Sequence, residues 1–408
     1  MEIESRLISI ETITPSSPTP KSLQKHQLSF FDQTTLPSFS HFVYLYSSNP
    51  KFSNSRKSKQ LKKSLSEALS IYYPLAGRIV GNLYVDCNDA GIPFSEAEAD
   101  CDLRQVITTQ NRTNLKKFLP LTTDDLCLAV QATYLRCGGL AVGISLAHKI
   151  SDALSFVLFV NTWSALARDG GAPAPLVKLD TATYAPPLDI LQSPSAKLLE
   201  EEVTASTFLF SAPEIAALQE RYTAAGGHRP SRVEALSAFI WTSYVSAVGV
   251  RSDQGYTCVV YNSINLRSRA HPPLSVHQFG NLIVPSTVEA VPGDSGVQLI
   301  RKMREASMAV NAGYVAGLKK REMQLEVLRN TSRAAVDRFF FSSVCRIPLY
   351  EADFGWGTPD RVINVGMPVK NVVYFMDTKS GGGIETKIQL TKADMEKLEA
   401  LLMIKSKL

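Results

Sequence analysis

The sequence has few cysteines and shows none of the short-spaced pairs that bind zinc or perform redox chemistry. No CxxC occurs, and no histidine stands at the spacing of a zinc ligand. We therefore expect no bound metal and reduced, mostly buried thiols. The cysteines are Cys87, Cys101, Cys127, Cys137, Cys258 and Cys345.

Long apolar runs are also missing. No stretch approaches the roughly 18 consecutive apolar residues that a membrane span requires. Residues 1–20 carry acidic side chains where a signal peptide carries positive charge, and no apolar segment follows them. These absences predict a soluble, intracellular protein.

The sequence lacks a strong charge of either sign. Its 43 basic and 38 acidic residues give a formal net charge of +5. For a chain of 408 residues this excess of positive charge is too small to indicate a nucleic-acid partner. A local cluster of arginines remains able to hold a phosphorylated co-substrate, because the field depends on clustering rather than on the sum.

The length and the distribution of breakers predict two domains. The chain has 408 residues, of which 45% are apolar, and helical and strand periods are mixed without a strict βαβ rhythm. A proline-rich stretch without either period separates the halves. We expect an α/β fold with an N-terminal domain over 1–170, a crossover over 171–203 and a C-terminal domain over 204–408.

Several elements can be placed from local patterns. Apolar residues at helical spacing in 58–73 predict a helix that Pro74 ends. Residues 126–147 predict a hairpin of two buried strands with its turn at Gly138–Gly139. Residues 372–390 predict a second hairpin with glycines 381–383 in its turn.

The stretch "LAVGISLAHKISDALSF" (residues 140–156) contains the one histidine with a suggestive setting. His148 follows an apolar strand and precedes a helix start, where a side chain can face a cleft while its backbone is held rigidly. Imidazole titrates near neutrality and can therefore accept and return a proton. From spacing alone, His148 is either a general base or an ordinary core residue, and the other histidines are expected on the surface or in loops.

Asp152, four residues further on, also has two interpretations. It could orient the His148 imidazole as in a triad. Alternatively, Asp152 or Ser151 could cap the following helix, where an acidic side chain favours the helix N-terminus.

Three motifs together point to a family. "YPLAGR" (73–78), "HKISD" (148–152) and "DFGWG" (353–357) occur in this order. This set resembles the plant BAHD acyltransferases, a family of coenzyme A dependent enzymes with HxxxD near the middle and DFGWG near the end. The pattern is most similar to the branch that acetylates alkaloids and terpenoids. Ala153 departs from the glycine that often follows the aspartate.

The resemblance implies the fold and the roles of particular residues. It implies two chloramphenicol-acetyltransferase-like domains, with His148 as the general base. Asp152 would point away from the reacting atoms and pair with an arginine, for which we select Arg267. The DFGWG motif would be structural, through Asp353, Gly355, Trp356 and Gly357.

The resemblance further implies the reaction. The enzyme would transfer an acyl group, most simply acetyl, from acyl-CoA to a hydroxyl of a small plant metabolite in a ternary complex. Acyl-CoA would be a co-substrate, no cofactor would be tightly bound, and the protein would be a monomer. An aromatic acyl-CoA donor, an amine acceptor and a non-catalytic binding relative remain alternatives.

The phosphates of coenzyme A require cations and backbone donors. Arg229, Ser231 and Arg232 stand at the start of a predicted helix and are our candidates for this contact. Residues 379–385, "KSGGGIE", are a second candidate, although a hairpin turn also explains their glycines.

The last three residues, Ser406, Lys407 and Leu408, form the tripeptide that the peroxisomal import receptor reads. We therefore expect peroxisomal import, with the cytoplasm as the alternative location.

Overall fold

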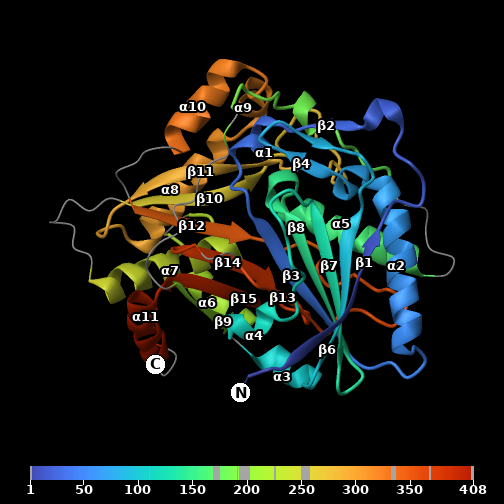
Figure 1. Cartoon of the computed structure of the whole chain (residues 1–408). Coiled ribbons are helices and arrows are strands. Elements are labelled where there is room, and N and C mark those ends of the chain that lie inside the picture. Colours follow the sequence, from blue (N-terminus) through green and yellow to red (C-terminus); the bar gives the residue numbers. More distant parts are fainter. Residues whose placement is uncertain are drawn as a thin grey trace. The chain divides into compact units, whose positions relative to one another are not determined.

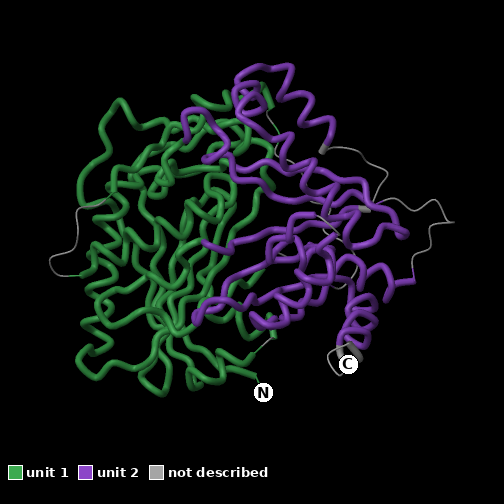
Figure 2. Tube along the Cα trace, turned by 180° about the vertical axis from the view of Figure 1, so that it is seen from behind, with its two compact units in different colours: residues 1–196, 274–282, 347–367 green, residues 197–273, 283–346, 368–408 purple. Residues whose placement is uncertain are grey.

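The chain divides into two units, which Figure 2 shows in different colours. Unit 1 consists of Met1–Ala196, Leu274–Leu282 and Ile347–Met367, and unit 2 consists of Lys197–Pro273, Ile283–Arg346 and Pro368–Leu408. This computed structural model describes residues 2–109, 111–168, 175–190, 192, 203–224, 227–249, 258–331, 337–366 and 369–405. Each unit has its own mixed sheet with flanking helices (Figure 1), which confirms the predicted two-domain α/β fold.

Unit 1 contains two sheets. The six-stranded sheet has the order β1-β6-β7-β8-β3-β13, and a small sheet has the order β2-β5-β4. The strands are β1 (Ser5–Ile13), β2 (Lys25–Gln27), β3 (Phe39–Tyr46), β4 (Arg78–Val80), β5 (Tyr84–Asp86), β6 (Ile92–Ala99), β7 (Leu128–Leu135), β8 (Leu140–Ala147) and β13 (Arg361–Asn364). The helices are α1 (Phe30–Thr34), α2 (Asn54–Ile71), α3 (Leu103–Thr108), α4 (Arg112–Lys116) and α5 (Ala153–Ala167), with single 3-10 turns η1 (Lys21–Leu23), η2 (Tyr73–Ala76), η3 (His148–Ile150) and η4 (Thr181–Thr183).

The predicted central hairpin is confirmed. Strands β7 and β8 pair antiparallel and every residue of both is buried. Gly138 in the connecting turn has φ = 78°, a conformation that glycine adopts without steric cost. Because β8 also pairs with β3, it is an internal strand, and its C-terminal end is held on both sides.

The two longest helices of unit 1 pack against each other, as their apolar stripes require. Leu61 and Leu65 of α2 are fully buried, which confirms the predicted helix. The indole N–H of Trp163 in α5 donates to the Leu61 carbonyl at 3.2 Å and to Ser64 Oγ at 3.0 Å.

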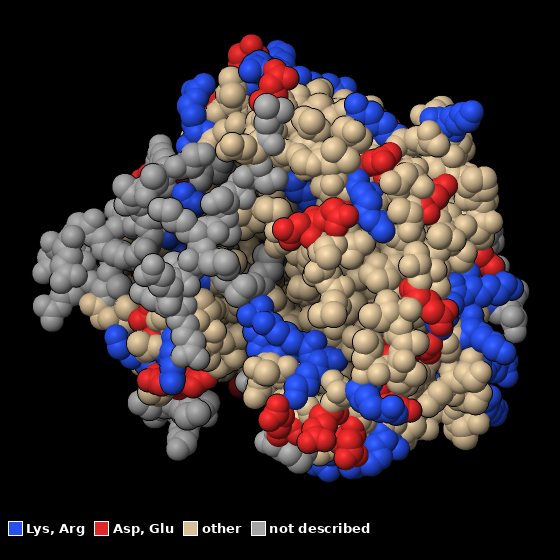
Figure 3. Space-filling view, in the orientation of Figure 1, with Lys and Arg blue, Asp and Glu red and all other residues tan. Residues whose placement is uncertain are grey.

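In the view of Figure 3, lysines and arginines lie beside aspartates and glutamates, in keeping with the small net charge.

The division into units differs from the predicted boundaries in two respects. Unit 1 extends to Ala196 and unit 2 begins at Lys197, so the predicted crossover over 171–203 is divided between the two units. Residues 204–408 were expected to form one continuous domain, yet Leu274–Leu282 and Ile347–Met367 belong to unit 1. The physical reason for the second segment is strand pairing. Strand β13 completes the edge of the unit 1 sheet by pairing antiparallel with β3, and its Val362 is fully buried.

Unit 2 has a six-stranded sheet in the order β11-β10-β12-β14-β15-β9. Its strands are β9 (Val203–Phe210), β10 (Cys258–Asn265), β11 (Ile283–Ala290), β12 (Asp337–Ser343), β14 (Val372–Asp377) and β15 (Ile384–Thr391). Its helices are α6 (Ala212–Arg221), α7 (Arg232–Val248), α8 (Gly296–Ala309), α9 (Ala312–Gly317), α10 (Arg321–Thr331) and α11 (Lys392–Lys405). The second predicted hairpin is confirmed as β14 and β15.

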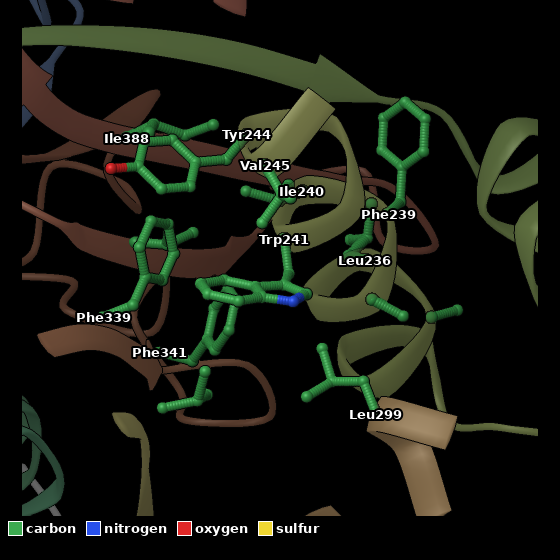
Figure 4. Close-up of a cluster of buried hydrophobic side chains, with 14 of the residues drawn as sticks. Leu236, Phe239, Ile240, Trp241, Tyr244, Val245, Leu299, Phe339, Phe341 and Ile388 are labelled. Atoms are coloured by element: carbon green, nitrogen blue, oxygen red, sulfur yellow. The ribbon is translucent and has the colours of Figure 1, made fainter. Parts of the chain in front are cut away.

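An aromatic cluster forms the core of unit 2 (Figure 4). Trp241 of α7 contacts Phe339 of β12 edge to face, with ring centroids 5.6 Å apart. Phe339 and Phe341 are fully or almost fully buried, so α7 is fixed to the sheet by large side chains.

The histidines show one error of the sequence analysis. His26 on β2 is buried and His41 on β3 is half-buried, whereas both were expected on the surface or in loops. Loss of hydration lowers the pKa of each imidazole to about 4, so both stay neutral at physiological pH. The small β2 strand was not predicted, which is why His26 looked exposed.

The cysteine thiols are mostly buried, as predicted. Cys87, Cys101, Cys127 and Cys258 are buried, Cys345 is half-buried and Cys137 is exposed. Within the described residues, no helix is both long and apolar enough to cross a membrane. Residues 406–408 lie outside the described part, and their recognition by an import receptor stays a prediction.

Candidate active site

His148 lies where β8 ends, and its backbone is fixed from two sides. Its amide N–H donates to the Ser38 carbonyl at 2.8 Å. Its carbonyl accepts a hydrogen bond of 2.7 Å from Nδ2 of Asn281. Such a clamp holds the residue rigidly while the imidazole remains partly exposed. Nδ1 of His148 is buried and has no hydrogen-bond partner among the described residues.

Asp152 is the N-cap of α5. Its Oδ1 accepts from the Ser155 amide at 2.9 Å, and its Oδ2 accepts from the Leu282 amide at 3.1 Å. The cap interpretation of Asp152 is therefore correct, and the carboxylate also braces the segment that contains Leu282. Arg267 is buried and contacts Asn265 in unit 2, so its predicted pairing with Asp152 of unit 1 stays a prediction.

The "DFGWG" motif forms a tight loop in unit 1. Oδ1 of Asp353 accepts from the amides of Gly355 (2.7 Å) and Gly357 (2.9 Å), whose φ angles are 105° and 114°. Trp356 is buried and meets Tyr46 edge to face. These contacts make Asp353 the brace of its own loop.

The start of α7 in unit 2 brings the two predicted coenzyme A candidates together. Ser231 caps the helix in a reciprocal arrangement with Glu234. Arg232 donates to Asp377 at 2.8 Å and to the Gly382 carbonyl at 3.1 Å, which ties the helix start to the β14–β15 turn. Arg229 pairs with Glu220 at 3.1 Å on the surface.

A further arginine, Arg304 of α8, is held by hydrogen bonds at the start of α7. Arg304 of α8 donates to Glu234 at 2.8 Å and to the backbone carbonyls of His228 and Arg229. The Arg304 guanidinium helps to lower the pKa of Glu234, against the opposing effect of burial. The backbone of the loop before α7 is thus held by the Arg304 side chain.

Two residues of the His148 surroundings were missed in the sequence. Asp32 and Asn281 are both buried and are joined by a hydrogen bond of 2.9 Å, although 249 residues separate them. Burial raises the pKa of Asp32, and hydrogen bonds from Ser29 and Asn281 oppose this effect. Asn281 could not be found from the sequence, because nothing in the neighbouring residues 279–284 indicates what it contacts.

Two α/β units, with a histidine clamped at the end of an internal strand and an aspartate that caps the next helix, fit the two-domain acyltransferase that the three motifs indicate. Within the described residues, no group of three His, Cys, Asp or Glu side chains could hold a metal ion.

Comparisons with known proteins support this class. The model of the Transferase family matches residues 3–402. Stemmadenine O-acetyltransferase of Catharanthus roseus is 31% identical, covering 98% of this chain and 97% of that protein. Limonoid 21-O-acetyltransferase of Citrus sinensis is 34% identical, covering 95% and 94%.

Vinorine synthase is similar in both sequence and structure. The Rauvolfia serpentina protein is 35% identical, covering 97% of this chain and 96% of that protein. The crystal structure of vinorine synthase aligns with a TM-score of 0.87 at 31% identity, covering 97% and 96% of the two chains. The chain therefore belongs to the Transferase family of BAHD acyltransferases and is an acyltransferase.

Proposed function

We propose that this enzyme transfers an acetyl group from acetyl-CoA to a hydroxyl group of an alkaloid or a terpenoid. The acetyl donor and the acceptor classes are those named for stemmadenine O-acetyltransferase and limonoid 21-O-acetyltransferase, which are similar over nearly the whole chain. The observation that carries the proposal is the fixed position of His148 at the end of β8.

His148 acts as the general base. Its imidazole takes the proton of the acceptor hydroxyl while the oxygen attacks the thioester carbonyl carbon. The tetrahedral intermediate then collapses, the carbon–sulfur bond breaks, and the imidazolium returns the proton to the departing thiolate. The proton balance closes without an acyl-enzyme, so both substrates are bound together.

A panel of donors and acceptors tests this function. With an alkaloid and a terpenoid alcohol as acceptors, acetyl-CoA is expected to give free thiol and an ester of equal amount, detected by thiol titration and mass spectrometry. Benzoyl- and hydroxycinnamoyl-CoA and amine acceptors are the comparison. Preference for an aromatic donor or an amine would replace the proposal, and absence of thiol release with every pair would favour a binding protein.

Arg229, Ser231 and Arg232 are proposed to contact the phosphates of coenzyme A. A capped helix start with two arginines offers both backbone donors and positive charge to an anion. Both arginines form an ion pair, Arg229 with Glu220 and Arg232 with Asp377. The Arg229 side chain is 51% exposed and that of Arg232 is 28% exposed, so Arg229 is freer to turn toward an anion.

Replacement of Arg229 with alanine is expected to raise the KM for acetyl-CoA by about three- to tenfold and to leave kcat unchanged, because the contact is equal in ground state and transition state. Arg301→Ala is the matched control, since Arg301 pairs with Glu305 on the same unit and is more than half exposed. Equal acetyl-CoA KM values for Arg229→Ala, Arg301→Ala and the unsubstituted enzyme would remove Arg229 from the site.

A further inference from the structure

The buried amide of Asn281 connects the His148 loop to α1. Its Nδ2 donates to the His148 carbonyl at 2.7 Å and to Asp32 Oδ1 at 2.9 Å, and the residue is fully buried. A flipped amide would set Oδ1 against the His148 carbonyl oxygen, and two acceptors repel. The orientation of the amide is therefore defined by the residue whose backbone it holds.

Asp32 is itself fixed, which makes it a firm anchor for Asn281. Its Oδ2 accepts from the amide of Ser29 at 2.8 Å and from Ser29 Oγ at 2.7 Å, and the two residues form a capping box at the start of α1. Movement of Asn281 away from His148 would break this buried arrangement as well.

The neighbours of Asn281 hold the same segment against α5. The amide and the carbonyl of Gly280 bond to Ser155 Oγ at 3.0 and 3.1 Å, and the amide of Leu282 bonds to Asp152. Gly280 has φ = 135°, and a Cβ there would lie 2.5 Å from Cγ2 of Thr181. Three consecutive residues thus fit one fixed path beside the His148 loop.

The His148 ring depends on this backbone. Its Nδ1 is buried without a hydrogen-bond partner among the described residues, so no side chain of that part orients the ring through this atom. The direction of the imidazole therefore depends on the His148 backbone. This backbone is held by two hydrogen bonds, one to the Ser38 carbonyl and one from the Asn281 side-chain amide.

We propose that Asn281, supported by Asp32, is a positioning residue that keeps the His148 backbone in the geometry required for proton transfer. The inference rests on the proposed role of His148 as general base. It assigns to the segment Phe279–Leu282 a task in the catalytic step, beyond its part in folding.

Asn281→Ala is expected to lower kcat for acetyl transfer by about ten- to a hundredfold, because misplacement of a catalytic group by about 1 Å has effects of this size. The KM values for acetyl-CoA and for the acceptor should stay within about twofold. Ser155→Ala is the matched control: it removes the hydrogen bonds to Gly280 and leaves the Asn281–His148 contact in place. It should lower the unfolding temperature with kcat kept within about threefold.

The exchange variant Asp32→Asn with Asn281→Asp keeps the experiment decisive if Asn281→Ala does not fold. An amide at 32 can donate to a carboxylate at 281, so the hydrogen bond between the two positions is expected to form again. The unfolding temperature should recover only in part, because the carboxylate then faces the His148 carbonyl without a proton to donate. A carboxylate at 281 cannot donate to the His148 carbonyl, so kcat should remain low. Recovery of kcat in the exchange variant, or equal kcat losses in Asn281→Ala and Ser155→Ala, would overturn the proposal.

His148→Ala measured beside these variants separates two kinds of failure. Normal turnover by His148→Ala would refute the general-base assignment and the positioning role with it. An inactive His148→Ala together with normal kcat for Asn281→Ala would refute the positioning role alone.

Discussion

Replacement of His148 with alanine is expected to lower kcat by about a hundredfold or more, the usual contribution of a general base. The alcohol proton then has no side-chain acceptor positioned at the reacting oxygen. Water, a much weaker base, must accept this proton as the oxygen attacks the thioester. The measurement is the initial rate of thiol release at saturating acetyl-CoA, confirmed by mass detection of the ester. His148→Gln, which keeps a polar side chain of similar size but takes up no proton, should be equally slow.

The fold should survive this change, which makes the loss interpretable. The hydrogen bonds from His148 to Ser38 and from Asn281 use backbone atoms of His148, and alanine keeps both. The unfolding temperature of His148→Ala should therefore lie within a few degrees of the unsubstituted enzyme. Turnover near the normal rate in a folded His148→Ala would exclude His148 as the base.

Features determined by neighbouring residues were predictable from the sequence. The β7–β8 hairpin follows from two apolar runs around Gly138–Gly139, and α2 follows from the spacing of Leu61 and Leu65. The choice between Asp152 as a cap and as a triad member needed the structure, because both fit the same four-residue spacing.

Features determined by distant residues were not predictable. Strand β13 pairs with β3 across more than 300 residues, so the C-terminal half could not be seen to return to the first sheet. Asn281 reaches His148 and Asp32 only after the chain has folded, and a single asparagine in "FGNL" carries no periodic or capping signal. Pairing of this kind depends on tertiary packing, which local propensity does not encode.

Gly143 gives the largest effect on stability that we expect. It lies in the middle of β8, opposite Val43 of β3 and Gln131 of β7, in an ordinary strand conformation. A Cβ built at this position overlaps the carbonyl oxygen of Phe118 and lies 3.3 Å from Cα of Leu119. The absence of a side chain here is required by close approach of another backbone segment, rather than by an unusual φ.

The segment that Gly143 faces has little freedom to move. Phe118 is fully buried in the cluster that includes Val43 and Ala141. The Lys117 carbonyl accepts from Gln131 Nε2 at 2.8 Å, which ties this segment to β7. The overlap must therefore be relieved by displacement of β8 or by loss of the buried contacts of Phe118.

Gly143→Ala is consequently expected to destabilise the protein by about 3 kcal/mol or more, at the upper end for overpacked cores. The measurement is the denaturant midpoint of unfolding, with the soluble yield at one growth temperature beside it. Gly293→Ala is the matched control, because no atom lies within 4 Å of its built Cβ, and it should change stability by less than about 0.5 kcal/mol. Equal unfolding midpoints for both variants would contradict the prediction, because they would show that residues 118–119 move to make room for the added methyl group. Because β8 ends at Ala147, directly before His148, a folded Gly143→Ala protein should also show a fold decrease in kcat that exceeds the fold change in its KM for acetyl-CoA.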